Sequence, residues 1–166
     1  MITEYLLSFF SLFFSAENQL VTMFVSGFLS STLLPGNSEV IFSTLAGQQI
    51  LLDKTLWSPS LVMLILVATF SNALGSFVTY LMGKLVPKPI DPKNRYAKWA
   101  LAKSEKYGVV ILLLSWLPLV GDLLCGIAGW LKFPVKQTLF YLIVGKFLRY
   151  LLLLFSVYPF VKYVVE

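Results

Sequence analysis

Four charged side chains lie inside long apolar stretches of the sequence. Two are the acids Glu39 and Asp122, and two are the bases Lys146 and Arg149 near the middle of residues 137–158. A charge at the centre of a membrane helix costs roughly 2.5–3.5 kcal/mol on insertion scales. A partner of opposite charge or a hydrated cavity offsets this cost, so we expect the acids to face the bases. Such a cluster can bind ions or anionic groups, or exchange protons.

Each acid follows a break in its apolar segment and stands four residues after a proline. The break residues are Pro35, Gly36 and Asn37 before the first acid, and Pro118 and Gly121 before the second. Proline lacks an N–H group and interrupts a helix, and lipid cannot satisfy the backbone groups that this frees. Broken segments in corresponding positions of two halves are typical of transporter binding sites. The alternative is a surface loop that joins two short spans at each break.

The composition indicates an integral membrane protein. Hydrophobic residues make up 58% of the chain and charged residues 13%, whereas soluble domains carry about 25% charged residues. No long stretch alternates apolar and polar residues, so the spans are predicted to be helices rather than barrel strands. The chain has no histidine and one cysteine, Cys125, which we interpret as a packing residue. We expect no metal, no cofactor and no enzyme activity, because no nucleophile–base set is visible.

The sequence predicts one all-α membrane domain over residues 1–166, with interfacial amphipathic helices. Its expected parts are an interfacial helix (1–17), a first hairpin (18–52), a transmembrane helix (60–82), a basic cytoplasmic segment (83–107), a second hairpin (108–131) and a last transmembrane helix (137–158). Each hairpin arm holds about a dozen apolar residues, whereas a span needs about 20. We therefore predict re-entrant hairpins and an inverted repeat, in which a hairpin plus a transmembrane helix occurs twice. The tail after residue 158 is expected at the interface.

One face of the first transmembrane helix carries small residues at spacings of three and four. They are Ala68, Asn72, Gly75, Thr79 and Gly83. Small residues let helix backbones approach closely in membranes, so this face predicts a tight helix–helix seam. Asn72 is its strongly polar member, and it either forms a hydrogen bond across the seam or contacts a substrate.

The basic residues are concentrated in one part of the chain. Residues 1–53 contain no Lys or Arg, whereas residues 83–107 contain seven. Because loops rich in Lys and Arg stay in the cytoplasm, the basic segment is predicted to be cytoplasmic and both termini to face outward. The same segment suits an anionic membrane surface, and the distribution indicates membrane orientation rather than nucleic-acid binding.

Taken together, these motifs resemble the DedA family of membrane proteins, also called the SNARE-associated or VTT-domain family, and most of all its short YqaA branch. The motifs are Leu-Leu-Pro-Gly-Asn-Ser-Glu at 33–39, Asn-Ala-Leu-Gly at 72–75, Ser-Trp-Leu-Pro-Leu-Val-Gly-Asp at 115–122 and Gly-Lys-Phe-Leu-Arg-Tyr at 145–150. The resemblance implies two re-entrant hairpins that meet in mid-membrane, a multi-pass protein of the bacterial inner membrane, and work on lipids. It also implies that Glu39 is the functional acid at the first hairpin tip.

The chain departs from the family pattern at the second hairpin. Longer members have two arginines around the second proline, and here Gly121 and apolar or small residues near Trp116 hold those places. We hypothesise that Lys146 and Arg149 supply the missing positive charge.

These observations lead to one main functional hypothesis and two alternatives. The main hypothesis is a lipid translocase or scramblase that moves a phospholipid or polyprenyl-phosphate carrier and is coupled to protons. Its partners would be lipids with anionic phosphate headgroups, and a homo-oligomer is compatible with the sequence. The first alternative is a small cation/proton antiporter that uses the same pocket. The second is a non-transporting membrane scaffold, in which the charge pairs only fix the helix register.

Overall fold

The computed structural model describes residues 18–32, 38–55, 57–87, 95–117 and 120–165, and these residues form helices and connecting turns without a strand. The elements are α2 (Gln19–Thr32), α3 (Ser38–Asp53), α4 (Pro59–Leu85), α5 (Arg95–Tyr107), the 3-10 helix η1 (Gly108–Trp116), α6 (Val120–Trp130) and α7 (Val135–Val165). The all-helical prediction is therefore confirmed for the described part of the chain. The interfacial helix predicted at 1–17 lies outside the described residues.

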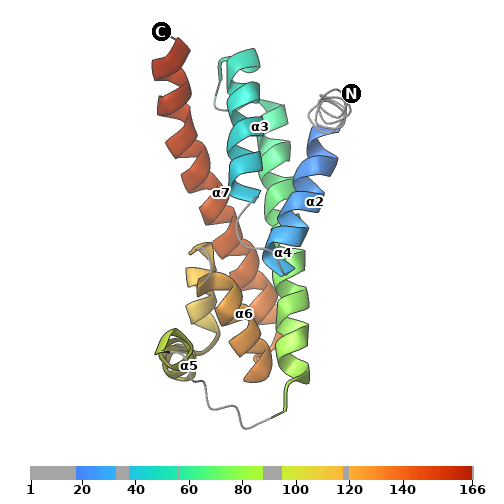
Figure 1. Cartoon of the computed structure of the whole chain (residues 1–166), viewed down its shortest axis with the longest axis vertical. Helices are drawn as coiled ribbons and strands as arrows, with labels where there is room; N and C mark the ends of the chain where they lie inside the picture. Colours follow the sequence, from blue (N-terminus) through green and yellow to red (C-terminus); the bar gives the residue numbers. More distant parts are fainter. Residues whose placement is uncertain (1–17, 33–37, 56, 88–94, 118–119, 166) are drawn as a thin grey trace, which may run out of the picture.

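Two long helices, α4 and α7, run along the molecule, and the shorter helices α2, α3, η1 and α6 pack against them (Figure 1). At a rise of 1.5 Å per residue, α4 is about 40 Å long and α7 about 46 Å, compared with about 30 Å for a hydrocarbon core. Both helices are long and apolar enough to cross a membrane, as judged by length and composition. The side chain of Ser58 caps the start of α4 by accepting a hydrogen bond from the Leu61 amide at 3.2 Å.

The short helices form two hairpins at opposite ends of the molecule. Figure 1 shows α2 and α3 beside one half of the long helices, and η1 and α6 beside the other half. In each hairpin the first arm packs on the long helix that follows it, α2 on α4 and η1 on α7. The second arm packs on the other long helix, α3 on α7 and α6 on α4. The two halves of the chain therefore make equivalent contacts.

The small-residue face of α4 is the seam that the sequence predicts. A side chain added at Gly75 would overlap Ser31 and the Phe28 carbonyl of α2, and one added at Gly83 would overlap the backbone of Gly126 in α6. Thr79 also donates a hydrogen bond to the Ser31 carbonyl at 3.1 Å. The prediction of a tight helix–helix seam is confirmed. The small-residue face of α4 packs against α2 in one half of the molecule and against α6 in the other.

Two helical features differ from the expectation. The first arm of the second hairpin is a nine-residue 3-10 helix, and such runs rarely exceed three or four residues. Gly108, the first residue of η1, has φ +60 and directly follows the end of α5. The second difference is that α7 continues through Pro159 to Val165 instead of ending near residue 158. Val161, beyond the proline, packs on the apolar core and faces Gly47 of α3, and this tertiary packing holds the helix together.

The buried apolar residues form two clusters, one in each half of the molecule. The first cluster includes Tyr150 and Leu154 of α7, and the second includes Leu142 of the same helix. Lys146 and Arg149 lie between these positions and are themselves buried. On α4, buried Asn72 likewise lies between Ala68 of the first cluster and Tyr80 of the second. A polar layer therefore separates the two apolar clusters at mid-length.

Candidate functional site

The structure joins the four deep charges into two acid–base pairs. A guanidinium nitrogen of Arg149, Nη2, donates a hydrogen bond to Oε1 of Glu39. The ammonium nitrogen of Lys146 donates to Oδ1 of Asp122 at 3.3 Å. Each hairpin therefore supplies one acid, and a single turn of α7 supplies both bases.

Each acid lies in the first turn of a short helix. Glu39 is in the first turn of α3, and Asp122 is in the first turn of α6. The unpaired N–H groups and the dipole of a helix make its N-terminus favourable for negative charge, typically by 0.3–1 kcal/mol at exposed sites. The hairpin geometry therefore presents two helix N-termini, each with a carboxylate, to the same part of α7.

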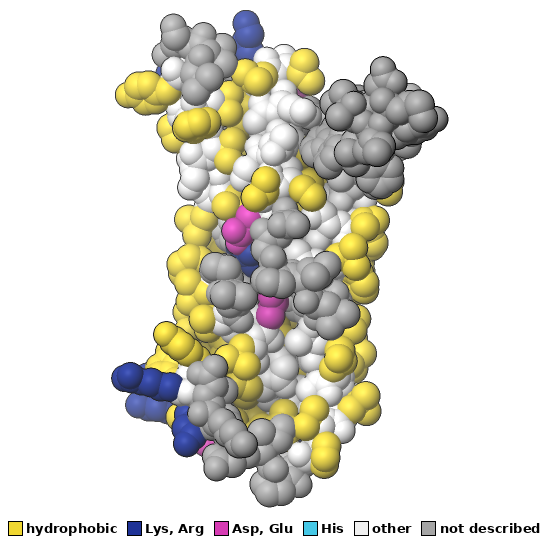
Figure 2. Space-filling view, viewed as in Figure 1, with side chains coloured by type: hydrophobic (Ala, Val, Ile, Leu, Met, Phe, Trp, Pro, Cys, Tyr) yellow, Lys and Arg dark blue, Asp and Glu magenta, His cyan; other side chains and the backbone are white. Residues whose placement is uncertain are grey.

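The two bases are buried, and the two acids are partly accessible. The side chains of Lys146 and Arg149 are 1% and 10% exposed, whereas those of Asp122 and Glu39 are 33% and 32% exposed. Figure 2 shows acidic side chains with a basic one beside them halfway along the molecule, away from the basic cluster at one end. A molecule that reaches this site therefore meets the carboxylates first, with the cations behind them.

A hydrogen-bond network lies beside the Glu39–Arg149 pair and connects four helices. The Asn72 amide nitrogen donates to the Tyr150 hydroxyl at 3.1 Å and lies 3.5 Å from the Ser30 hydroxyl. Ser30 in turn donates to the hydroxyl of Ser38, at the start of α3, at 2.8 Å. The network thus connects α2, α3, α4 and α7 next to the first ion pair.

Asn72 therefore forms the cross-seam hydrogen bond that was one of its two predicted roles. Its carbonyl oxygen is buried and has no hydrogen-bond partner among the described residues. A substrate contact by Asn72 stays a prediction. Tyr150, Ser30 and Ser38 were not among the predicted site residues. The sequence contained one signal for Tyr150. It directly follows Arg149, so it lies at nearly the same level along the helix as a charge that was expected inside the membrane.

The predicted hairpin tips are only partly described. Pro35, Gly36, Asn37 and Pro118 lie outside the described residues. Gly121 is described, and its amide donates to the Leu117 carbonyl at 3.0 Å as α6 begins. A Cβ atom at Gly121 would lie 2.5 Å from the Ser115 carbonyl oxygen, so glycine lets η1 and α6 approach closely here.

The charges of the site can bind an anion or a proton. Within the described ranges, no group of three or more His, Cys, Asp or Glu side chains could hold a metal ion. Cys125 is free and buried in α6. The site instead combines two cations, two carboxylates and two helix N-termini, which is a set that can exchange one anion for another.

Comparison with known proteins places the chain in a family. The VTT domain model matches residues 34–159, a range that contains both acid–base pairs. The chain belongs to the VTT-domain (DedA) family. The resemblance stated from the sequence is thereby confirmed, and the protein is a membrane protein of this family.

Curated relatives of this VTT-domain protein match over most of its length. A Haemophilus influenzae protein is 49% identical over 153 residues, which cover 92% of this chain and 96% of the relative. The inner membrane proteins YqaA of Escherichia coli and of Shigella flexneri are each 40% identical over 131 residues, which cover 79% of this chain and 85% of each relative. No solved structure matches the chain.

Proposed function

We propose that the protein moves lipids between the two leaflets of the bacterial inner membrane, as a translocase or scramblase for a phospholipid or polyprenyl-phosphate carrier. One observation carries this proposal: both acid–base pairs lie at mid-length, where the N-terminal ends of α3 and α6 meet the centre of α7. Moving a lipid requires a polar place for its headgroup halfway across the hydrocarbon core. The described charges would form that place.

The lengths of the elements support a re-entrant arrangement. At helical rises of 1.5 Å for α-helix and about 2.0 Å for 3-10 helix, the hairpin arms are about 16–24 Å long, shorter than a hydrocarbon core of about 30 Å. In this proposal each hairpin enters and leaves on its own side, and α4 and α7 cross the membrane. The equivalent contacts of the two halves fit an inverted repeat. The basic helix α5 would lie on the cytoplasmic surface.

The headgroup would bind by replacing carboxylates as partners of the two bases. Arg149 and Lys146 can each hold a phosphate oxygen, and the amide groups at the starts of α3 and α6 favour the same anion. The acyl tails would remain in lipid throughout. No covalent chemistry is required, and we propose transport rather than catalysis.

Proton coupling would use the same two pairs. Protonation of Glu39 removes its negative charge, so Arg149 loses its counter-ion and becomes free to bind a phosphate. Deprotonation restores the ion pair and expels the phosphate. About a third of the Glu39 side chain is exposed, so protein atoms do not enclose the carboxylate that would take up the proton. A proton gradient would thereby drive or gate lipid movement.

The test is lipid movement in proteoliposomes, with labelled phospholipid and polyprenyl phosphate compared with and without a pH gradient. We expect wild-type protein to move one of these lipids faster under the gradient, and Glu39→Gln to lose the dependence on the gradient. Glu105→Gln is the matched control, because it makes the same chemical change on an exposed position of α5. Full, gradient-dependent movement in both Glu39→Gln and Arg149→Met would refute the scheme.

The same vesicles separate the proposed function from its alternatives. Cation flux without lipid movement would identify an antiporter. If folded protein in the vesicles supports neither cation flux nor lipid movement, the scaffold is the hypothesis that remains. The scaffold also predicts that the double variant Glu39→Gln with Arg149→Met folds as well as the wild type, because only the charge pair would be removed.

A further inference from the structure

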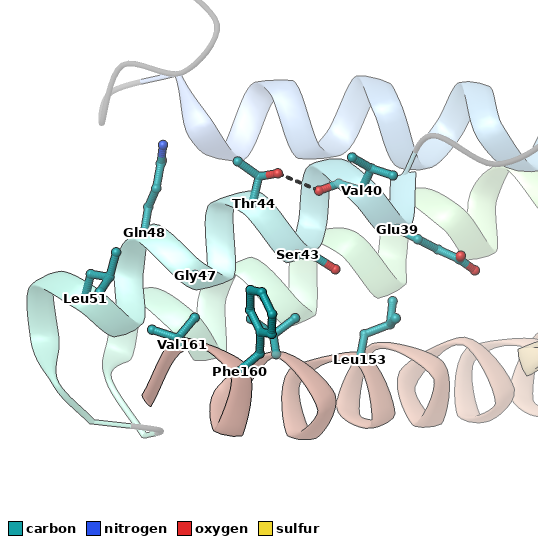
Figure 3. A pocket seen from close by; sticks show the side chains of 11 residues that line it. Glu39, Val40, Ser43, Thr44, Gly47, Gln48, Leu51, Leu153, Phe160 and Val161 are labelled. Carbon is teal, nitrogen blue, oxygen red and sulfur yellow. Dashed lines mark hydrogen bonds between the residues drawn. The ribbon is translucent and has the colours of Figure 1, made fainter. Parts of the chain in front are cut away.

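A groove of about 610 Å³ runs between α3 and the C-terminal half of α7 (Figure 3). Glu39, at the start of α3, lines the end of the groove at the middle of the molecule. Leu51, near the end of α3, lines the opposite end of the groove. Its apolar lining residues are Val40, Leu51, Leu153, Val157, Phe160 and Val161. The groove therefore begins at an ion pair and continues between apolar walls.

Two of the polar residues that line the groove, Thr44 and Gln48, form their hydrogen bonds outside it. Thr44 donates to the Val40 carbonyl of its own helix at 2.8 Å, and the side-chain oxygen of Gln48 accepts from Gln19 of α2 at 3.4 Å. Figure 3 shows both side chains pointing away from α7, whereas Leu153 and Phe160 of α7 point toward α3. The interior of the groove consequently suits an apolar occupant.

Gly47 gives the groove its width at the place where α3 and α7 face each other. A Cβ atom at this position would lie 3.7 Å from Val161 and 4.0 Å from Val157, which is ordinary contact. A larger side chain would therefore extend into the groove and fill it, whereas alanine would fit without strain.

The length of the groove matches one leaflet of a membrane. From Glu39 to Leu51, α3 rises about 18 Å, and half of a hydrocarbon core is about 15 Å. One acyl chain of a membrane lipid spans one leaflet, so a single chain would fill the groove from end to end. Val40, Leu51 and Phe160 are also exposed on the outer surface of the helices, which leaves the groove open toward lipid.

The charge at the inner end selects the headgroup. Glu39 lines that end, and the buried guanidinium of Arg149 is bound to its carboxylate. The phosphodiester of a phospholipid carries one negative charge, as the carboxylate does, and its two free oxygens can replace the carboxylate on the guanidinium. We propose that the groove binds one acyl chain of an anionic membrane phospholipid, with its phosphate at Arg149. The inference rests on the proposed function and adds the place where a tail lies while the headgroup is at mid-membrane.

The experiment uses the full chain in vesicles of phosphatidylethanolamine and phosphatidylglycerol. A tracer phosphatidylglycerol carries a diazirine on one acyl chain, and a second tracer is a diacylglycerol with the same chain and no phosphate. After illumination, peptide mass spectrometry compares adducts on α3 and the C-terminal half of α7 with adducts on exposed Val62 and Phe70 of α4, which serve as the lipid-facing reference.

We expect the phosphatidylglycerol tracer to label the groove about fivefold more, relative to α4, than the diacylglycerol tracer does. Gly47→Trp should remove this excess, and Gly47→Ala should keep it. Equal ratios for both tracers in the wild type would overturn the proposal. So would normal labelling of α4 with an unlabelled groove, because another occupant, such as a second copy of the chain, would then cover it.

A parallel measurement of lipid movement in the same vesicles separates this inference from the proposed function. Groove labelling without lipid movement would refute the transport function and keep the lipid site. Lipid movement with no excess labelling in the groove would refute the lipid site alone. If Gly47→Trp fails to fold, the comparison of the two tracers on wild-type protein still decides the question.

Discussion

Replacing Asp122 by asparagine would leave a buried lysine without a counter-charge. The Lys146 side chain is 1% exposed, and its ammonium group donates to Asp122 at 3.3 Å. Removing one partner of a buried ion pair typically costs about 3–5 kcal/mol, because the remaining charge is still buried. Asp122 itself is 33% exposed, so protein atoms do not fully enclose the pair, and we expect a loss at the lower end of this range, near 3 kcal/mol.

The double variant tests whether this loss comes from the unpaired charge. Lys146→Met removes the charge and keeps a side chain of similar length, so the pair Asp122→Asn with Lys146→Met should recover most of the stability. A double-mutant cycle, measured by unfolding in mixed micelles, gives the interaction energy of the two positions. We expect it to exceed about 1.5 kcal/mol.

Two outcomes would refute this reasoning. If Asp122→Asn costs less than about 1 kcal/mol, the lysine finds another partner or water, and the ion pair does not hold the second hairpin. If the double variant is as unstable as the single one, the aspartate stabilises the protein in a different way, for example by stabilising the start of α6. Asp53→Asn is the matched control, since Asp53 is exposed at the end of α3.

Three further changes test the seam, the hydrogen-bond network and the cap of α4, each measured as the free energy of unfolding. Gly75→Leu should cost about 1–3 kcal/mol, because its side chain would overlap α2; an unchanged stability would contradict the seam. Tyr150→Phe should cost about 1 kcal/mol by removing the partner of Asn72, while the ring contact with Phe42 at 4.9 Å is kept; no loss would mean that the network contributes nothing. Ser58→Ala should cost about 0.5–2 kcal/mol by removing the cap of α4, and Ser60→Ala, which leaves that cap in place, should be near neutral.

The sequence was sufficient to predict that the deep charges have partners. Insertion of an unpaired charge is costly, and the only acids at comparable depth were Glu39 and Asp122. Which acid meets which base could not be predicted, because Lys146 and Arg149 lie on one helix turn. Their partners depend on how far each hairpin reaches along α7, and that depends on tertiary packing.

Local rules were less reliable for the two segments whose conformation depends on their neighbours. Residues 108–116 are almost entirely apolar, so no periodic pattern distinguishes an α-helix from the 3-10 helix that forms. Proline usually ends a helix, yet α7 continues through Pro159, where Val157 and Val161 pack on the apolar core. In both segments the packing partners come from distant parts of the chain, and a local pattern does not contain them.

If the protein transports lipids as we propose, the polar layer would let the same charges stabilise the fold and take part in transport. The apolar clusters hold each half of the molecule separately, and the two ion pairs connect both hairpins to one turn of α7. If a hairpin moves along α7, its ion pair must break, and each separated charge then needs a substitute partner. A proton neutralises the acid, and an anionic headgroup neutralises the base. The requirement that buried charges stay compensated thus favours movement of a hairpin when a proton and a phosphate arrive together.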